Sequence, residues 1–191
     1  MLNIAILASG NGSNAQRIIE YFSSNKNIHF PFIITNNEDA FVRERAKTLN
    51  IPSVFIENKK LKTEENLLNI LLENKIDWVI LAGYLLLIPS NVVNYYKHKI
   101  INIHPALLPK YGGKGMFGMK VHEAVIADKE EESGISIHYV NEKYDEGDII
   151  FHAKTSIDIN DTAESLAKKI HLLEYEHYPQ IIEKLISDNI R

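Results

Sequence analysis

Short continuous runs of apolar residues alternate along the chain with stretches in which apolar residues recur every three or four positions. The short runs indicate strands buried on both faces, and the periodic stretches indicate helices that cover them. The predicted strands are Asn3–Ala8, Phe30–Thr35, Ser53–Ile56, Trp78–Leu81 and Lys99–His104, and the predicted helices are Ser13–Phe22, Glu38–Leu49, Thr63–Asn74 and Pro89–Tyr96. This alternation is typical of βαβ units and predicts an α/β fold with a doubly wound, mostly parallel sheet.

The pattern changes after Leu108. The glycine-rich segment Lys110–Gly118 predicts a mobile loop. Gly134–Val140 and Asp148–Ala153 then indicate a strand pair, and Thr162–Ile186 indicates a long C-terminal helix. Since the chain shows no repeat or linker, we expect residues 1–191 to form a single domain.

The composition of the chain argues against several classes of protein function. The 191 residues include 21 Lys and Arg against 25 Asp and Glu, a formal charge of −4, which argues against a basic nucleic-acid-binding face. The chain has no cysteine, so disulfides, thiolate nucleophiles and Cys-ligated zinc are excluded. No apolar stretch reaches the span of a membrane helix, and Asn3–Ala8 is too short for a signal-peptide core. We therefore expect a cytoplasmic protein that does not bind membranes.

The segment Ile100–Pro109 places two polar side chains at the end of a predicted strand. Asn102 and His104 share a face of that strand because they are two residues apart, and Pro105 ends the pairing. An amide donor beside a titratable imidazole suits the polarisation of a carbonyl group. The alternative is a strand end with two incidental polar residues, although Asn is a poor strand former.

The first predicted strand leads into a loop, Ser9–Asn14, that contains two glycines and precedes a helix. Free backbone N–H groups at a helix N-terminus suit a phosphate, and Ser13 and Asn14 add donors or cap the helix. The spacing Gly10-x-Gly12-x-x-Ala15 also satisfies the dinucleotide fingerprint. However, the second strand ends in Thr35-Asn36-Asn37 without the acid that would hold a ribose, and we expect Glu38 and Asp39 in the next helix. We favour a phosphomonoester site over a dinucleotide site or a simple turn.

Asp145 lies in the acidic loop between the predicted strand pair, where it could lie against His104 or be merely solvated. A carboxylate beside an imidazole raises its pKa and orients it. His138 could support this pair or be a hydrogen-bonded core residue. His171, Glu174 and His177 are spaced i, i+3, i+6, which is poor for a metal because the outer two are about 120° apart around a helix. Glu174 therefore either accepts from a polar substrate or lies on a solvated face.

Gly83–Pro89 is an apolar loop that follows the fourth predicted strand. Ligands of open α/β sheets lie at the carboxyl ends of the strands. The loop therefore indicates either a surface for an aromatic ligand or ordinary core.

Three motifs, Ser9–Asn14, Asn102–Pro109 and Tyr144–Gly147, resemble those of the phosphoribosylglycinamide formyltransferase family, the folate-dependent enzymes of purine biosynthesis. The resemblance runs from Asn3 to about Pro179 and implies a single formyltransferase domain. It implies transfer of a formyl group from 10-formyltetrahydrofolate to the amine of 5′-phosphoribosylglycinamide, without a metal. Small-molecule substrates are expected, with no nucleic acid or membrane partner, in a monomer or homodimer.

The resemblance also implies roles for individual residues, numbered as in this sequence. The catalytic trio would be Asn102, His104 and Asp145. The ribonucleotide would contact Gly12, Ser13, Asn14, His171 and Glu174. The folate would contact Leu85, Leu86, Leu87, Ile88, Asn102, Asn141, Glu142, Lys143, Tyr144 and Asp145.

The chain departs from the family in the residues expected near the folate tail. Relatives often carry an arginine at the position of Leu86, and only Lys62 could represent an upstream basic contact. A methionyl-tRNA formyltransferase should have a further C-terminal RNA-binding domain and a more basic balance. A formyltetrahydrofolate hydrolase should have an N-terminal regulatory domain, and a sugar-nucleotide formyltransferase would not need the Gly12–Asn14 loop. A dinucleotide-binding oxidoreductase and a non-catalytic ligand-binding relative are the remaining alternatives.

Overall fold

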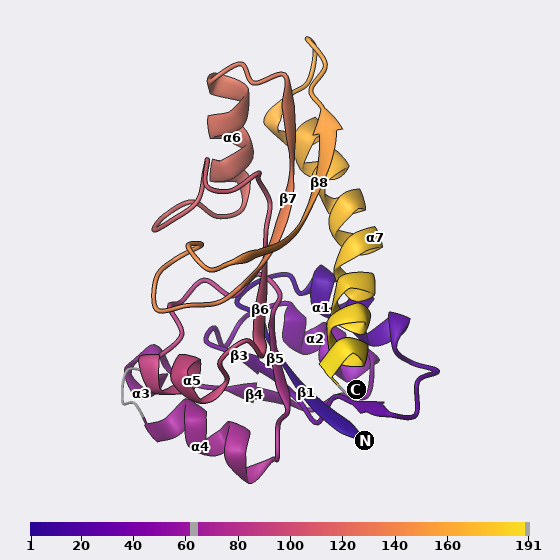
Figure 1. Cartoon of the computed structure of the whole chain (residues 1–191), viewed down its shortest axis with the longest axis vertical. Coiled ribbons are helices and arrows are strands. Elements are labelled where there is room, and N and C mark those ends of the chain that lie inside the picture. The colour runs from indigo at the N-terminus through magenta and orange to yellow at the C-terminus, as the bar shows by residue number, and fades with distance from the viewer. Residues whose placement is uncertain (62–64, 190–191) are drawn as a thin grey trace. The chain divides into compact units, whose positions relative to one another are not determined.

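The computed structural model describes residues 1–61 and 65–189. The chain divides into two compact units. The first unit contains Met1–Asn102 and Val140–Glu142, and the second contains Ile103–Tyr139 and Lys143–Arg191. Each unit has its own strands and helices (Figure 1).

The first unit is built on a parallel sheet. Its strands lie in the order β4 (Ser53–Phe55), β3 (Ile33–Thr35), β1 (Leu2–Leu7), β5 (Trp78–Leu81) and β6 (Ile100–His104). The last two residues of β6 belong to the second unit. A short strand, β2 (Ile28–His29), pairs in parallel with the first residues of β1.

Helices cover both faces of this sheet: α1 (Ser13–Tyr21), α2 (Val42–Thr48), α3 (Asn58–Leu61), α4 (Glu65–Glu73) and α5 (Ser90–Tyr95). In Figure 1, α4 and α5 lie on one side of β1 and β5, and α1 and α2 lie on the other. Leu7 belongs to a buried cluster with Leu71 and Val92, whereas its neighbour Ile6 points the opposite way and is equally buried. A sheet buried on both faces explains the continuous apolar runs and confirms the doubly wound prediction.

The second unit contains α6 (Met119–Ala127), β7 (Glu132–Tyr139), β8 (Ile149–Ser156) and α7 (Ala163–Asn189). The strands β7 and β8 pair antiparallel, with Ser136 opposite His152 and a register shift at Ile137/His138. The helix α7 packs along both strands and against α6. The predicted strand pair and long C-terminal helix are thus confirmed.

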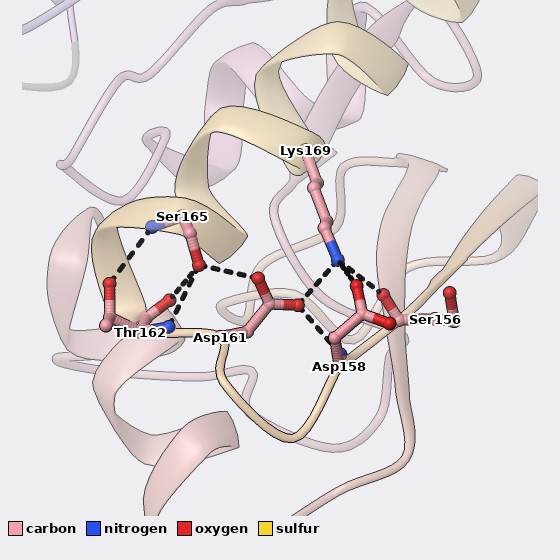
Figure 2. A network of polar contacts seen from close by, with 6 residues as sticks. All are labelled: Ser156, Asp158, Asp161, Thr162, Ser165 and Lys169. Carbon is pink, nitrogen blue, oxygen red and sulfur yellow. Dashed lines mark hydrogen bonds and ion pairs between the residues drawn. The ribbon is translucent and has the colours of Figure 1, made fainter.

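A polar network ties the start of α7 to the end of β8 (Figure 2). The Nζ atom of Lys169 donates to Asp158 Oδ2 (2.7 Å), to Asp161 Oδ2 (2.5 Å) and to the Ser156 carbonyl (3.3 Å). Thr162 and Ser165 form a reciprocal cap, since Ser165 N donates to Thr162 Oγ1 and Thr162 N donates to Ser165 Oγ. This network sets where the helix that carries His171 and Glu174 begins.

Several sequence predictions were wrong in detail. The helix α2 begins at Val42 rather than Glu38, because Asn37 accepts from the Asp39 and Ala40 amides and closes a turn. Glu38 and Asp39 therefore precede the helix. The elements β2, α3 and α6 were not predicted; α6 buries only Val121, His122 and Val125, too few positions for a clear period. The predicted helix at Thr63–Asn74 corresponds to α4, but its first two residues lie outside the described residues.

Candidate active site

The strand β6 ends at His104, immediately before Pro105. His104 is buried (4% exposed), and Asn102, the last residue of that strand in the first unit, is partly buried. The alternation of a strand gives both side chains the same direction along β6. The predicted strand end is therefore present, with a buried imidazole.

The imidazole of His104 lies between two oxygen atoms of the second unit. Its Nδ1 is 3.5 Å from Asp145 Oδ2, and its Nε2 is 2.7 Å from the Tyr111 carbonyl oxygen. A neutral imidazole carries one N–H group, so only one of the two nitrogens can donate, whereas an imidazolium satisfies both oxygens. The expected approach of Asp145 to His104 is present.

Asp145 is itself held by two further groups. Its Oδ2 accepts from the Gly113 amide (2.9 Å), and its Oδ1 is 3.6 Å from His138 Nε2. The residue lies in the loop between β7 and β8 with a positive φ of 56°, and its side chain is 12% exposed. His138 is buried, with Nδ1 2.8 Å from its neighbour's carbonyl oxygen, so it combines both roles left open by the sequence.

The pKa of His104 is shifted in the direction opposite to the one that a neighbouring carboxylate alone would cause. Burial lowers the pKa of His104 and outweighs the opposing charge of Asp145, so the net shift is downward. Burial raises the pKa of Asp145, but the hydrogen bond with His138 and the charge of His104 lower it below its usual range. The predicted raised pKa of the imidazole was therefore wrong in its net direction. The pKa values of both members of the pair are therefore lowered, that of His104 by burial and that of Asp145 by its two histidine neighbours.

A second buried carboxylate, Glu174, lies on α7. It is 5% exposed and accepts from His171 Nδ1 at 2.9 Å, so the solvated-face alternative was wrong. That hydrogen bond raises the pKa of His171. His177 does not join them, because its ring packs against Phe151 with centroids 5.1 Å apart. Within residues 1–61 and 65–189, no group of three or more side chains is arranged to hold a metal ion.

His122 on α6 was not identified from the sequence. It is 3% exposed, and its Nδ1 atom is buried without a hydrogen-bond partner. Burial lowers the pKa of His122, and the charge of Glu174 opposes that shift. A lone histidine in a short helix gives no sequence signal that distinguishes it from a surface residue.

The glycine loop of the first unit leads directly into α1. Gly12 is the N-terminal cap residue, in the left-handed region (φ 76°), and no side chain caps the helix. Ser13 and Asn14 form the first turn, so the prediction that either could cap α1 was wrong. The three residues are contiguous at a helix N-terminus, where uncapped N–H groups suit an anion.

The residue at the end of β3 argues against a dinucleotide site. Asn36 stands where an acid would hold the ribose, and its Oδ1 accepts from Ser9 Oγ at 2.5 Å. Its Nδ2 donates to Asn58 Oδ1 at 3.2 Å. The side chain at this position is thus neutral and already paired.

The apolar loop after β5 divides its side chains between core and solvent. Leu86 packs against the core cluster and Ile88 is buried, whereas Leu85 and Leu87 are each 43% exposed. The Leu85 amide donates to Ser9 Oγ (2.9 Å), which joins this loop to the glycine loop. Leu86 and Ile88 therefore match the core interpretation, whereas the ligand surface at Leu85 and Leu87 stays a prediction.

The remaining predicted folate contacts lie in both units. Asn141 and Glu142 belong to the first, where Glu142 accepts from Asn94 Nδ2 at 3.4 Å. Lys143, Tyr144 and Asp145 belong to the second, where Lys143 pairs with a neighbouring glutamate at 2.9 Å. Lys62 lies outside the described residues.

Comparisons with known proteins identify the family of the chain. Residues 2–182 match the formyl transferase family. The chain is 35% identical to a phosphoribosylglycinamide formyltransferase of Bacillus subtilis, over 100% of this chain and 98% of that protein. It is 37% identical to a chloroplastic phosphoribosylglycinamide formyltransferase of Arabidopsis thaliana, of which it spans 66%. A crystal structure of phosphoribosylglycinamide formyltransferase from Bacillus halodurans superposes with a TM-score of 0.87 at 35% identity, covering 97% of this chain and 95% of that one.

Proposed function

This chain belongs to the formyl transferase family, and on that basis we propose that it is a phosphoribosylglycinamide formyltransferase. It transfers the formyl group of 10-formyltetrahydrofolate to the amine of 5′-phosphoribosylglycinamide. The products are the N-formyl ribonucleotide and tetrahydrofolate, in the de novo pathway to purines. The observation that carries this proposal is the buried imidazole of His104 beside the carboxylate of Asp145.

The reaction needs a group that stabilises negative charge on the formyl oxygen. The amine attacks the formyl carbon, and the tetrahedral intermediate carries an oxyanion. Asn102 and His104 donate hydrogen bonds to that oxygen, and the loss of one such donor typically lowers the rate about 10²–10³-fold. Because Nε2 of His104 lies against the Tyr111 carbonyl, this carbonyl has to withdraw before Nε2 can donate to substrate.

Asp145 orients the imidazole of His104 through Nδ1 and favours its protonated form. Its carboxylate is ionised, so it can also accept the proton that leaves the attacking amine, directly or through water. The proton then passes to the folate nitrogen as the carbon–nitrogen bond breaks. No covalent enzyme intermediate and no metal ion is needed for these steps.

The substrates would bind to groups already described within each unit. The amides of Gly12, Ser13 and Asn14 hold the phosphate, and the buried carboxylate of Glu174, with His171, contacts the glycinamide end. The folate ring lies against Leu85–Ile88 and Asn141–Asp145, where the exposed Leu85 and Leu87 offer apolar surface. The family match over residues 2–182 supports a single formyltransferase domain.

We further propose a cytoplasmic enzyme with small-molecule substrates, active as a monomer or homodimer without nucleic acid or membrane partners. In the described part of the chain, no helix is long and apolar enough to cross a membrane.

The proposal is tested by a comparison of acceptors. Purified enzyme is given 10-formyltetrahydrofolate with phosphoribosylglycinamide, with an amino-sugar nucleotide, with methionyl-tRNA or with water alone, and formylated product is quantified. We expect product only with the ribonucleotide. Hydrolysis without transfer, or transfer to another acceptor, would replace this function with that of another member of the family.

A further inference from the structure

Arg45 on α2 reaches across to the glycine loop that precedes α1. Its Nε donates to the Asn11 carbonyl (2.9 Å), and its Nη2 donates to Asn11 Oδ1 (2.7 Å). Its Nη1 donates to Gln16 Oε1, one turn into α1. One guanidinium therefore holds both the loop and the helix that follows it, and all of these residues belong to the first unit.

The charge of Arg45 is not neutralised by these partners. Both acceptor residues are neutral amides, and the guanidinium lies 5.0 Å from the centre of the Phe41 ring. Among residues 1–61 and 65–189, no carboxylate forms an ion pair with Arg45. The nearest acid in this chain of contacts is Glu20, which accepts from Gln16 Nε2 at 2.7 Å. A full positive charge is thus held at a loop suited to an anion.

The helix α2 also sets the shape of the loop. The Val42 amide donates to the Gly10 carbonyl at 3.1 Å. A Cβ atom at Gly12 would lie 2.3 Å from Val42 Cγ2, so the loop backbone is pressed directly against α2. Arg45, one turn further along α2, donates hydrogen bonds to Asn11, the residue between these two glycines.

From these contacts we propose that Arg45 is a positioning residue of the phosphate site. Its fork holds Asn11 so that the amides of Gly12, Ser13 and Asn14 converge on a phosphate monoester, and its charge offsets that of the dianion. The inference deepens the proposed function, on which it rests, and it concerns the ribonucleotide alone. The folate and the formyl chemistry do not depend on Arg45.

The direct test is a titration with inorganic phosphate, followed by the amide resonances of Gly12, Ser13 and Asn14. Wild type is compared with Arg45→Gln, Arg45→Lys and the matched control Lys47→Gln. The control removes the same charge from the same helix, at a side chain that is paired with Glu44 and exposed. We expect Arg45→Gln to weaken phosphate binding about tenfold or more, because two charge-assisted hydrogen bonds to the loop are lost. The phosphate affinity of Arg45→Lys should lie between those of wild type and Arg45→Gln, since lysine keeps the charge but lacks the planar guanidinium. Lys47→Gln should change phosphate affinity less than about twofold.

The same variants are then measured in formyl transfer. The KM for phosphoribosylglycinamide should rise by the factor seen with phosphate, while kcat and the KM for the folate stay within about twofold of wild type. A purely structural role would lower kcat and raise both KM values together, and this result would overturn the inference. If Arg45→Gln does not fold, Arg45→Lys carries the same test in the same direction.

The phosphate titration tests the role of Arg45, whereas the formyl-transfer assay tests the proposed reaction. Equal phosphate affinity in wild type and Arg45→Gln overturns the inference, whether or not the enzyme transfers formyl groups. Wild-type loop amides that do not respond to phosphate also overturn it. An Arg45-dependent phosphate response without formyl transfer supports the phosphate site and rejects the proposed reaction.

Discussion

The two ring nitrogens of His104 each lie close to an oxygen atom, and these oxygens and the burial of the ring have opposite effects on its charge. The Tyr111 carbonyl and the Asp145 carboxylate favour an imidazolium, whereas burial at 4% exposure disfavours it. Burial prevails, so the pKa lies below the ordinary value of a histidine. A histidine poised in this way can give up a proton readily once an oxyanion forms beside it.

This balance predicts how His104 titrates. The pKa of His104, followed by the NMR shift of its Cε1 proton, should lie below about 6.5, the value of an unperturbed histidine. In Asp145→Asn the pKa should fall further, because the charge that favours the imidazolium is removed while the burial remains. An unchanged or higher pKa in the variant would show that Asp145 does not act on the imidazole.

The backbone conformation and close packing of Gly12 predict that a side chain there destabilises the protein. Its φ of 76° suits glycine, and a Cβ atom there would collide with Val42. Gly12→Ala should therefore lower the free energy of unfolding by about 2 kcal/mol or more. Gly10→Ala is the matched control, since nothing lies within 4 Å of a Cβ at Gly10. The control should change stability by no more than about 0.5 kcal/mol, as measured by urea denaturation, and equal losses in the two variants would contradict the steric account.

At the scale of elements, the start of α7 depends on the ion pairs of Lys169 (Figure 2). Hydrogen bonds from Lys169 and Ser165 lower the pKa of Asp161 to about 2. In an unfolded chain the pKa of this carboxyl is about 3.9. The stability it contributes is therefore complete above that value and is lost as the pH falls towards 2.

Lys169→Met tests this network. The substitution should lower Tm at pH 6. Between pH 5 and about 2.5, the Tm of the variant should then fall by less than the Tm of wild type does. Lys168→Met, one position earlier on the same helix, is the control. If the variant and wild type lose Tm in parallel with acid, the Lys169 network does not stabilise the start of α7.

The elements that the sequence predicted well are those buried on both faces. Trp78–Leu81 was placed to the residue, because Asp77 precedes this short apolar run and the turn residue Gly83 follows closely after it. The first residue of α2 was misplaced because a turn closed by Asn37 resembles a capped helix start. The helix α6 was missed because a glycine-rich loop precedes it and few of its residues are buried.

The candidate site could be predicted only in its side chains. Asn102, His104 and Asp145 carry recognisable chemistry in recognisable motifs. The Tyr111 carbonyl and the Gly113 amide, which hold His104 and Asp145, are backbone groups that any residue would supply. Arg45 and His122 were missed for a related reason, because only the folded chain brings them to the loop and to the buried histidines.

For the whole molecule, the resemblance stated from three motifs is confirmed by a family match over residues 2–182. That match extends through both compact units. The glycine loop belongs to the first unit, and the contact between His104 and Asp145 lies within the second.

The roles of His104 and Asp145 in formyl transfer are tested together by one comparison of rates. Initial rates of tetrahydrofolate formation from 10-formyltetrahydrofolate are compared with and without phosphoribosylglycinamide, for wild type, His104→Ala and Asp145→Asn, after circular dichroism has shown all three to be folded. We expect turnover that requires the ribonucleotide and falls about 10²–10³-fold in His104→Ala, with a loss of at least about 10²-fold in Asp145→Asn. Wild-type turnover that is independent of the ribonucleotide, or variants that retain the wild-type rate, would contradict this expectation.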